Sequence, residues 1–114
     1  MREYTERIDG FQIRDITYFP GYEPEVRPRE FDIVKWQSHE PRKVRDISDN
    51  KEIITTENCY SVAHLIWDNH EREFNLNSIG LRWLDAAPSN KVCKMIKNFA
   101  MFKTAEYNAI DEEE

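Results

Sequence analysis

Glycine, cysteine and long apolar runs are all scarce in this chain of 114 residues. The three glycines stand far apart, at positions 10, 21 and 80, so no Gly-rich loop is present to cradle a phosphate group. Cys59 and Cys93 are the only two cysteines. Two cysteines are too few for a disulfide scaffold, which favours a reducing compartment, and we expect a cytoplasmic protein without bound cofactors.

Apolar residues never form a run that approaches the about 18 needed for a membrane-spanning helix. The first ten residues, MREYTERIDG, also lack the apolar centre of an export signal. We therefore expect neither a membrane segment nor a membrane partner.

The negative charge is concentrated at one end. The formal net charge is −6, and the last four residues, DEEE, account for four of these charges. We predict one domain over residues 1–110 and an acidic tail over residues 111–114. The remaining body is nearly neutral and gives no broad attraction to phosphate, so direct nucleic-acid binding is not expected, despite the lysines at 91, 94 and 97.

Alternation of apolar and polar residues predicts an antiparallel, meander-like sheet of four or five strands. The expected strands are residues 11–19, 31–37, 59–67 and 74–84, with RKVRDI and EIITT as short exposed strands around a tip at Asp49-Asn50. Three prolines favour an extended connection over residues 20–30, and Gly80 suggests a bulge or a close backbone approach.

One amphipathic helix is predicted near the end of the chain, at about residues 89–108, with Ser89 as a candidate N-cap. From Val92 to Phe102 the apolar residues recur at steps of three and four, so one face of this helix can cover the sheet. The expected fold class is α+β, with the single C-terminal helix on one sheet face.

The stretch from 59 to 73 holds two of the three histidines but no recognisable catalytic motif. Strict alternation places His64 on the opposite strand face from Cys59 and separates it from Asp68 by about 13 Å, too far to share one metal ion. Neither HExxH nor a Cys-x-x-Cys pair is present. We therefore expect a protein that is not an enzyme. The alternative is a small metal-dependent hydrolase that uses His64, His70 and a carboxylate.

Aromatic residues outnumber what one helix can cover, since Trp36, Trp67 and Trp83 all fall on predicted strands. Two interpretations stay open: an exposed aromatic patch with a charged rim that binds protein, or a loop at residues 20–30 that folds back over these rings.

The predicted partner-binding site is the turn after strand 59–67. Its acidic residues suit Lys or Arg on a partner, and the neighbouring tryptophan would be an aromatic anchor. The residues of this site are Trp67, Asp68, His70, Glu71 and Glu73.

The stretch CYSVAHLIWDNHEREFNLNSIGLRWLD, followed by PSNKVCKMIKNF, resembles small uncharacterised proteins of phages and prophages of Gram-positive bacteria. The resemblance spans about residues 59–98, and its centre is the run Ser78-Ile79-Gly80-Leu81-Arg82-Trp83-Leu84. It implies a module that binds a host protein in the host cytoplasm and inhibits it, as anti-CRISPR proteins inhibit defence enzymes. The alternative is a phage structural protein that forms homo-oligomers. The sequence leaves open which partner is bound and whether acidic groups gather into a surface that mimics nucleic acid.

Overall fold

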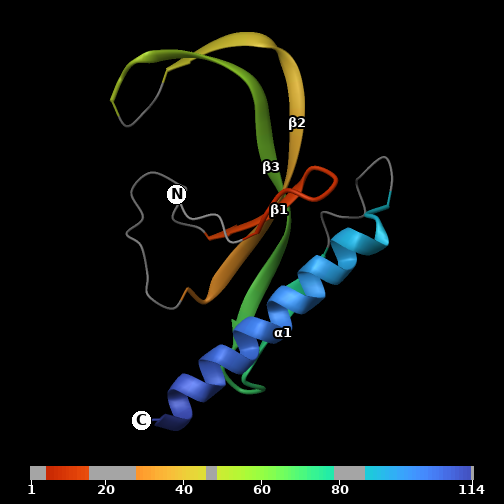
Figure 1. The fold of residues 1–114 in the computed structure, drawn as a ribbon. Coiled ribbons are helices and arrows are strands. Elements are labelled where there is room, and N and C mark those ends of the chain that lie inside the picture. The colour runs from red at the N-terminus through yellow and green to blue at the C-terminus, as the bar shows by residue number, and fades with distance from the viewer. Residues whose placement is uncertain (1–4, 16–27, 46–48, 79–86, 114) are drawn as a thin grey trace.

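A computed structural model describes residues 5–15, 28–45, 49–78 and 87–113, with the backbone alone for 111–113. The described elements are β1 (Phe11–Asp15), β2 (Glu30–Arg45), β3 (Glu52–Asp68), β4 (Glu73–Asn77) and α1 (Asn90–Glu113). The strands lie in the order β1-β2-β3-β4, and each neighbouring pair is antiparallel (Figure 1). The predicted α+β fold with one C-terminal helix is confirmed.

Strands β2 and β3 form one long hairpin. The predicted strand at 31–37 and the short strand after it are both parts of β2, and EIITT is the start of β3. The last pair of the hairpin is Arg45 with Glu52, so the predicted tip residues Asp49 and Asn50 fall in the connection between the two strands. The described sheet therefore has four strands, because the extra pair is continuous with the central one.

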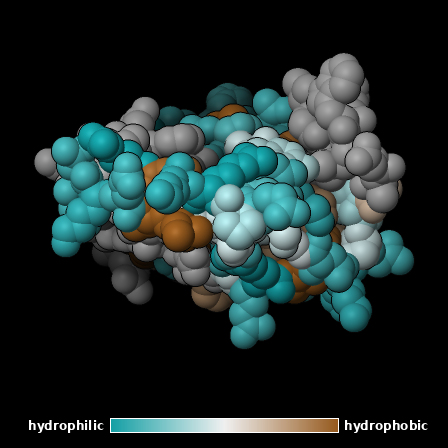
Figure 2. Space-filling view, turned by 90° about the horizontal axis from the view of Figure 1, so that it is seen from above, coloured by the Kyte–Doolittle hydropathy of each residue, from teal (hydrophilic) through white to brown (hydrophobic). Residues whose placement is uncertain are grey.

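The outer part of this hairpin, residues 38–45 and 52–58, is called the arm below. The pairing shifts between Ser38 and Arg42, where Pro41 has no N–H to donate to a ladder. The hairpin curls away from the helix, which covers the opposite end of the sheet (Figure 1). Val44, Ile53 and Ile54 are exposed on the arm, and Figure 2, seen from that side, shows apolar patches among hydrophilic side chains.

The core lies between one sheet face and α1. Phe31 sits at its centre, with ring centroids 5.4 Å from Phe74 and 5.1 Å from Phe99, both in edge-to-face contact. Aromatic pairs of this kind add about 0.5–1.5 kcal/mol each beyond the burial of apolar area. The other buried apolar residues in this cluster are Phe11, Ile13, Ile33, Val62, Ala63, Leu65, Val92, Ile96 and Tyr107.

The helix begins where the sequence predicts. The hydroxyl of Ser89 accepts the N–H of Val92 at 3.3 Å and donates to Asp9 Oδ2 at 2.6 Å, so the cap also ties the helix to the turn before β1. The helix runs past the predicted end at residue 108, to Glu113.

Some predictions fall outside the described residues: most of the loop at 20–30, the end of the first strand, Gly80 and Trp83. Among the described helices, none has the length and apolar character to cross a membrane.

Candidate functional site

The turn between β3 and β4 is organised by Asp68. Its Oδ1 accepts the backbone N–H groups of His70 at 2.8 Å and Glu71 at 3.0 Å, and its Oδ2 accepts Asn75 Nδ2 at 3.3 Å. The hydrogen bond from the Glu71 N–H, followed by that from His70, lowers the pKa of Asp68. Arg72 closes the turn in the left-handed region, with φ 59°. The carboxylate of Asp68 therefore stabilises the conformation of this turn through hydrogen bonds.

The other residues of the predicted partner site separate into two groups. The ring of Trp67 packs at 5.1 Å from Phe74 and 5.5 Å from Tyr107, and the guanidinium of Arg72 lies 5.1 Å from its centroid. Trp67 is thus half-buried in the layer between sheet and helix. His70, Glu71 and Glu73 are exposed, which leaves them as the accessible part of the predicted site.

A hollow of about 340 Å³ lies between strand β4 and helix α1. An adjoining hollow of about 330 Å³ shares Phe74, Ala100 and Met101 with it and reaches Glu73 at the turn. We call the two together the β4–α1 groove. Its lining residues are Leu65, Glu73, Phe74, Leu76, Cys93, Ile96, Lys97, Ala100, Met101, Thr104 and Ala105.

Strand β4 is the last strand of the described sheet and turns its outer edge toward this groove. The Phe74 N–H donates to Thr104 Oγ1 of α1 at 3.1 Å, so the backbone of Phe74 faces outward. Antiparallel pairing alternates, so the N–H and C=O of Leu76 face the same outer side. Because the Phe74 N–H is already bonded to Thr104, the outward-facing backbone groups beside the apolar side chains of the groove are those of Leu76.

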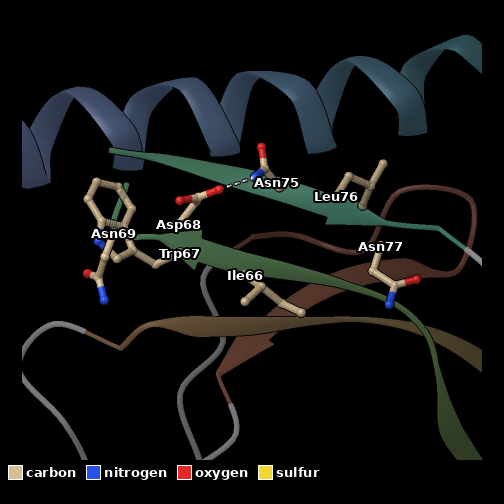
Figure 3. A pocket seen from close by; sticks show the side chains of 7 residues that line it. All are labelled: Ile66, Trp67, Asp68, Asn69, Asn75, Leu76 and Asn77. Carbon is tan, nitrogen blue, oxygen red and sulfur yellow. Dashed lines mark hydrogen bonds between the residues drawn. The ribbon is translucent and has the colours of Figure 1, made fainter. Parts of the chain in front are cut away.

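The opposite face of β3 and β4 carries a more polar hollow of about 410 Å³ (Figure 3). Asp68 and Asn75 are joined by their hydrogen bond at one end, with Ile66 and Asn77 further along (Figure 3). Three amide side chains and the Asp68 carboxylate line it together with Ile66, Trp67 and Leu76, so its lining is mixed.

A row of polar side chains crosses the same sheet face. Strand register aligns Arg14 with Asp32, Asp32 with His64, and His64 with Asn77. Nδ1 of His64 lies 2.6 Å from Asp32 Oδ1 and 3.0 Å from Glu30 Oε1. Asp32 is 2% exposed, while the His64 and Glu30 side chains are 38% and 39% exposed. One imidazole nitrogen therefore meets two carboxylates at the edge of the protein interior.

A β-bulge at Val62 explains why strict alternation assigned the wrong faces on β3. Ile33 pairs with Ala63, but the next residue, Val34, pairs with Ser61, so Val62 is an extra residue. Side chains before the bulge change face, and Ser61 joins His64, with its Oγ 3.4 Å from Nε2. The prediction that Cys59 and His64 lie on opposite strand faces is wrong for this reason, since one inserted residue inverts the pattern.

The residues that come together include His64 of the alternative metal-dependent hydrolase, with two carboxylates, but not its His70. His70 is exposed in the turn, and among the described residues the three side chains with converging ligand atoms are Glu30, Asp32 and His64. The prediction missed both acids because they lie on β2. The available signal was the Glu30-x-Asp32 spacing, which places two carboxylates on one strand face, opposite the strand that holds His64.

The aromatic side chain of Trp36 on this face is covered by the N-terminal segment. The Arg7 guanidinium lies 3.7 Å from the centroid of the Trp36 ring. The indole Nε1 of Trp36 donates to Gln12 Oε1 at 3.0 Å. Arg7 also pairs with Glu57 at 3.0 Å. Whether the loop at 20–30 adds to this cover falls outside the described residues.

Comparison with known proteins yields no relative: no family model, no curated protein and no solved structure matches the chain.

Proposed function

We propose that this protein is a small protein-binding module whose β4–α1 groove accepts an extended segment of a partner protein. The observation that carries the proposal is an apolar groove beside an outward-facing strand edge. Extended peptides commonly add to such an edge through backbone hydrogen bonds, while pockets beside the strand select their side chains.

Exposed apolar side chains at the groove support this function. Leu76 is 45% exposed and Met101 is 61% exposed, and both line the groove. Large apolar groups gain about 25 cal/mol for each Å² that a partner removes from water. A partner strand beside β4 would cover both side chains together.

The negative charge of the β3–β4 turn indicates which charged residues the bound segment should carry. Glu71 and Glu73 are exposed at one end of the groove, and Glu73 lines it. The segment that fits is apolar at alternate positions, with Lys or Arg where it passes the turn. A host enzyme as the partner, with inhibition as the outcome, is the prediction that the resemblance to phage proteins adds to this proposal.

A displayed library of random peptides tests the groove directly. Selection against the immobilised protein should enrich peptides that alternate apolar residues and carry Lys or Arg near one end. Met101→Glu should weaken their binding by at least about tenfold, a loss of about 1.4 kcal/mol. Phe102→Glu is the matched control, because Phe102 is 66% exposed on the same helix and does not line the groove.

Charge reversal at the turn separates the two parts of the site. Glu71→Lys with Glu73→Lys should weaken basic peptides and leave the melting temperature nearly unchanged, since both side chains are exposed. Peptides that tolerate both the Met101 and the Glu71/Glu73 substitutions would place the binding surface elsewhere.

A further inference from the structure

We propose that Glu30, Asp32 and His64 form a binding site for one divalent transition-metal ion of the Zn²⁺ or Mn²⁺ class. The site lies on the sheet face away from α1 and is separate from the β4–α1 groove. The proposal does not depend on peptide binding.

The ligand atoms already converge. One atom from each residue lies within 4.8 Å of the others, and Nδ1 of His64 lies within 3.0 Å of both carboxylates. An ion that binds each atom at about 2.1 Å needs ligand atoms about 3.4 Å apart. Small rotations of His64 and Glu30, both half-exposed, reach that spacing while Asp32 remains fixed in the interior.

Hydrogen bonding does not account for this convergence. Nδ1 of His64 is buried, and neither of its contacts with the described carboxylates has the alignment of a hydrogen bond. An ion placed between the three ligand atoms would contact all of them at once.

The surroundings of His64 match those of a metal ligand. Its second ring nitrogen, Nε2, lies 3.4 Å from Ser61 Oγ, the kind of outer contact that fixes ring orientation in metal sites. Asp32 and His64 are direct cross-strand partners on the two central strands, so the backbone of both ligands is held by the sheet.

The donor set indicates which ions fit. Two carboxylate oxygens and one imidazole nitrogen suit borderline ions such as Zn²⁺ and Mn²⁺, and the carboxylates match a charge of +2. Three protein ligands leave further coordination positions for water or another oxygen ligand. His64 pairs with Asn77, which lines the polar hollow of Figure 3, so these positions have a polar space nearby.

Calorimetric titration of the chelator-treated full chain with ZnCl₂, and separately with MnCl₂, tests the site. We expect one ion per chain and a rise in melting temperature on addition of the ion. Glu30→Gln and His64→Gln should each weaken binding by more than about 100-fold, beyond the 10–100-fold typical of outer partners. Ser61→Ala should weaken it by about tenfold.

Matched histidine controls separate this site from adventitious binding. His39→Gln and His70→Gln remove the other two imidazoles and should leave the affinity within about twofold of the parent protein, since the effects of distant sites are independent. Asp32 is buried, so its variant risks misfolding, and Glu30→Gln, at a half-exposed side chain, carries the test instead. The proposal is overturned if the parent chain binds neither ion, or if binding survives both Glu30→Gln and His64→Gln.

Discussion

His64 and Asp32 face each other directly across β3 and β2, with Nδ1 of the imidazole 2.6 Å from Oδ1 of the carboxylate. The pair joins a half-exposed ring to a carboxylate that is almost fully buried. A buried carboxylate needs compensating partners, so the contact has consequences for stability as well as for chemistry.

Removal of the imidazole should therefore destabilise the fold. We expect His64→Gln, measured in metal-free buffer, to lower the free energy of unfolding by about 1–3 kcal/mol, because the buried carboxylate loses a close partner. His70→Gln, at an exposed turn position, should change it by less than about 0.5 kcal/mol. Urea unfolding of His64→Gln, Asp32→Asn and the variant that carries both substitutions gives the coupling energy between His64 and Asp32. A coupling energy near zero would show that the contact has no energetic role.

The β3–β4 turn should respond to acid through Asp68. Hydrogen bonds from Glu71 and His70 hold its pKa below the ordinary value of 3.8. The stabilisation is therefore complete above pH 3.8 and is lost as the pH falls through the lowered folded-state pKa. Amide NMR signals of His70 and Glu71 should titrate with a midpoint below 3.8. Asp68→Asn should abolish this titration while its side-chain oxygen preserves the turn, and a midpoint at or above 3.8 in the parent chain would contradict the account.

The hydroxyl of Ser89 should stabilise the start of helix α1, and a threonine at the same position should replace it. Ser89→Ala removes both the acceptor for Val92 N–H and the donor to Asp9, and should lower the free energy of unfolding by about 0.5–2 kcal/mol. Ser89→Thr retains the hydroxyl and should restore most of this loss. Chemical denaturation distinguishes the cases: equal stability of the Ala and Thr variants would mean that the hydroxyl has no capping role.

The same Ile→Val substitution at two positions of the β2–β3 hairpin compares the contribution of the core to stability with that of the arm. Ile33 is fully buried in β2, whereas Ile54 in β3 is 68% exposed. Ile33→Val should lower the free energy of unfolding by about 0.5–1.5 kcal/mol. Ile54→Val makes the same chemical change and should cost less than about 0.5 kcal/mol. Similar losses at both positions would show that the arm is packed in solution.

The elements that depend on local pattern were predictable from the sequence. Apolar residues at helical spacing after Ser89 predicted α1, and alternation predicted the inner part of the β2–β3 hairpin. The arm was predicted only as separate short strands, because nothing local says that β2 continues through the bulge near Pro41.

The polar row depended on features that one sequence does not display. Strand register places Asp32 opposite His64, and register is set by contacts between distant segments. The bulge at Val62 adds one residue without any glycine or proline to mark it, and so Cys59 was assigned to the wrong face. Trp67 has the sequence context of an exposed anchor, yet the return of α1 over β4 places Tyr107 against its ring.

The most direct test of the proposed groove is amide hydrogen exchange of β4 with and without a selected peptide. We expect the Leu76 amide, which faces the outer edge, to become protected when the peptide adds a strand there, and Met101→Glu to remove this protection. Unchanged exchange at Leu76 in the presence of saturating peptide would contradict the account.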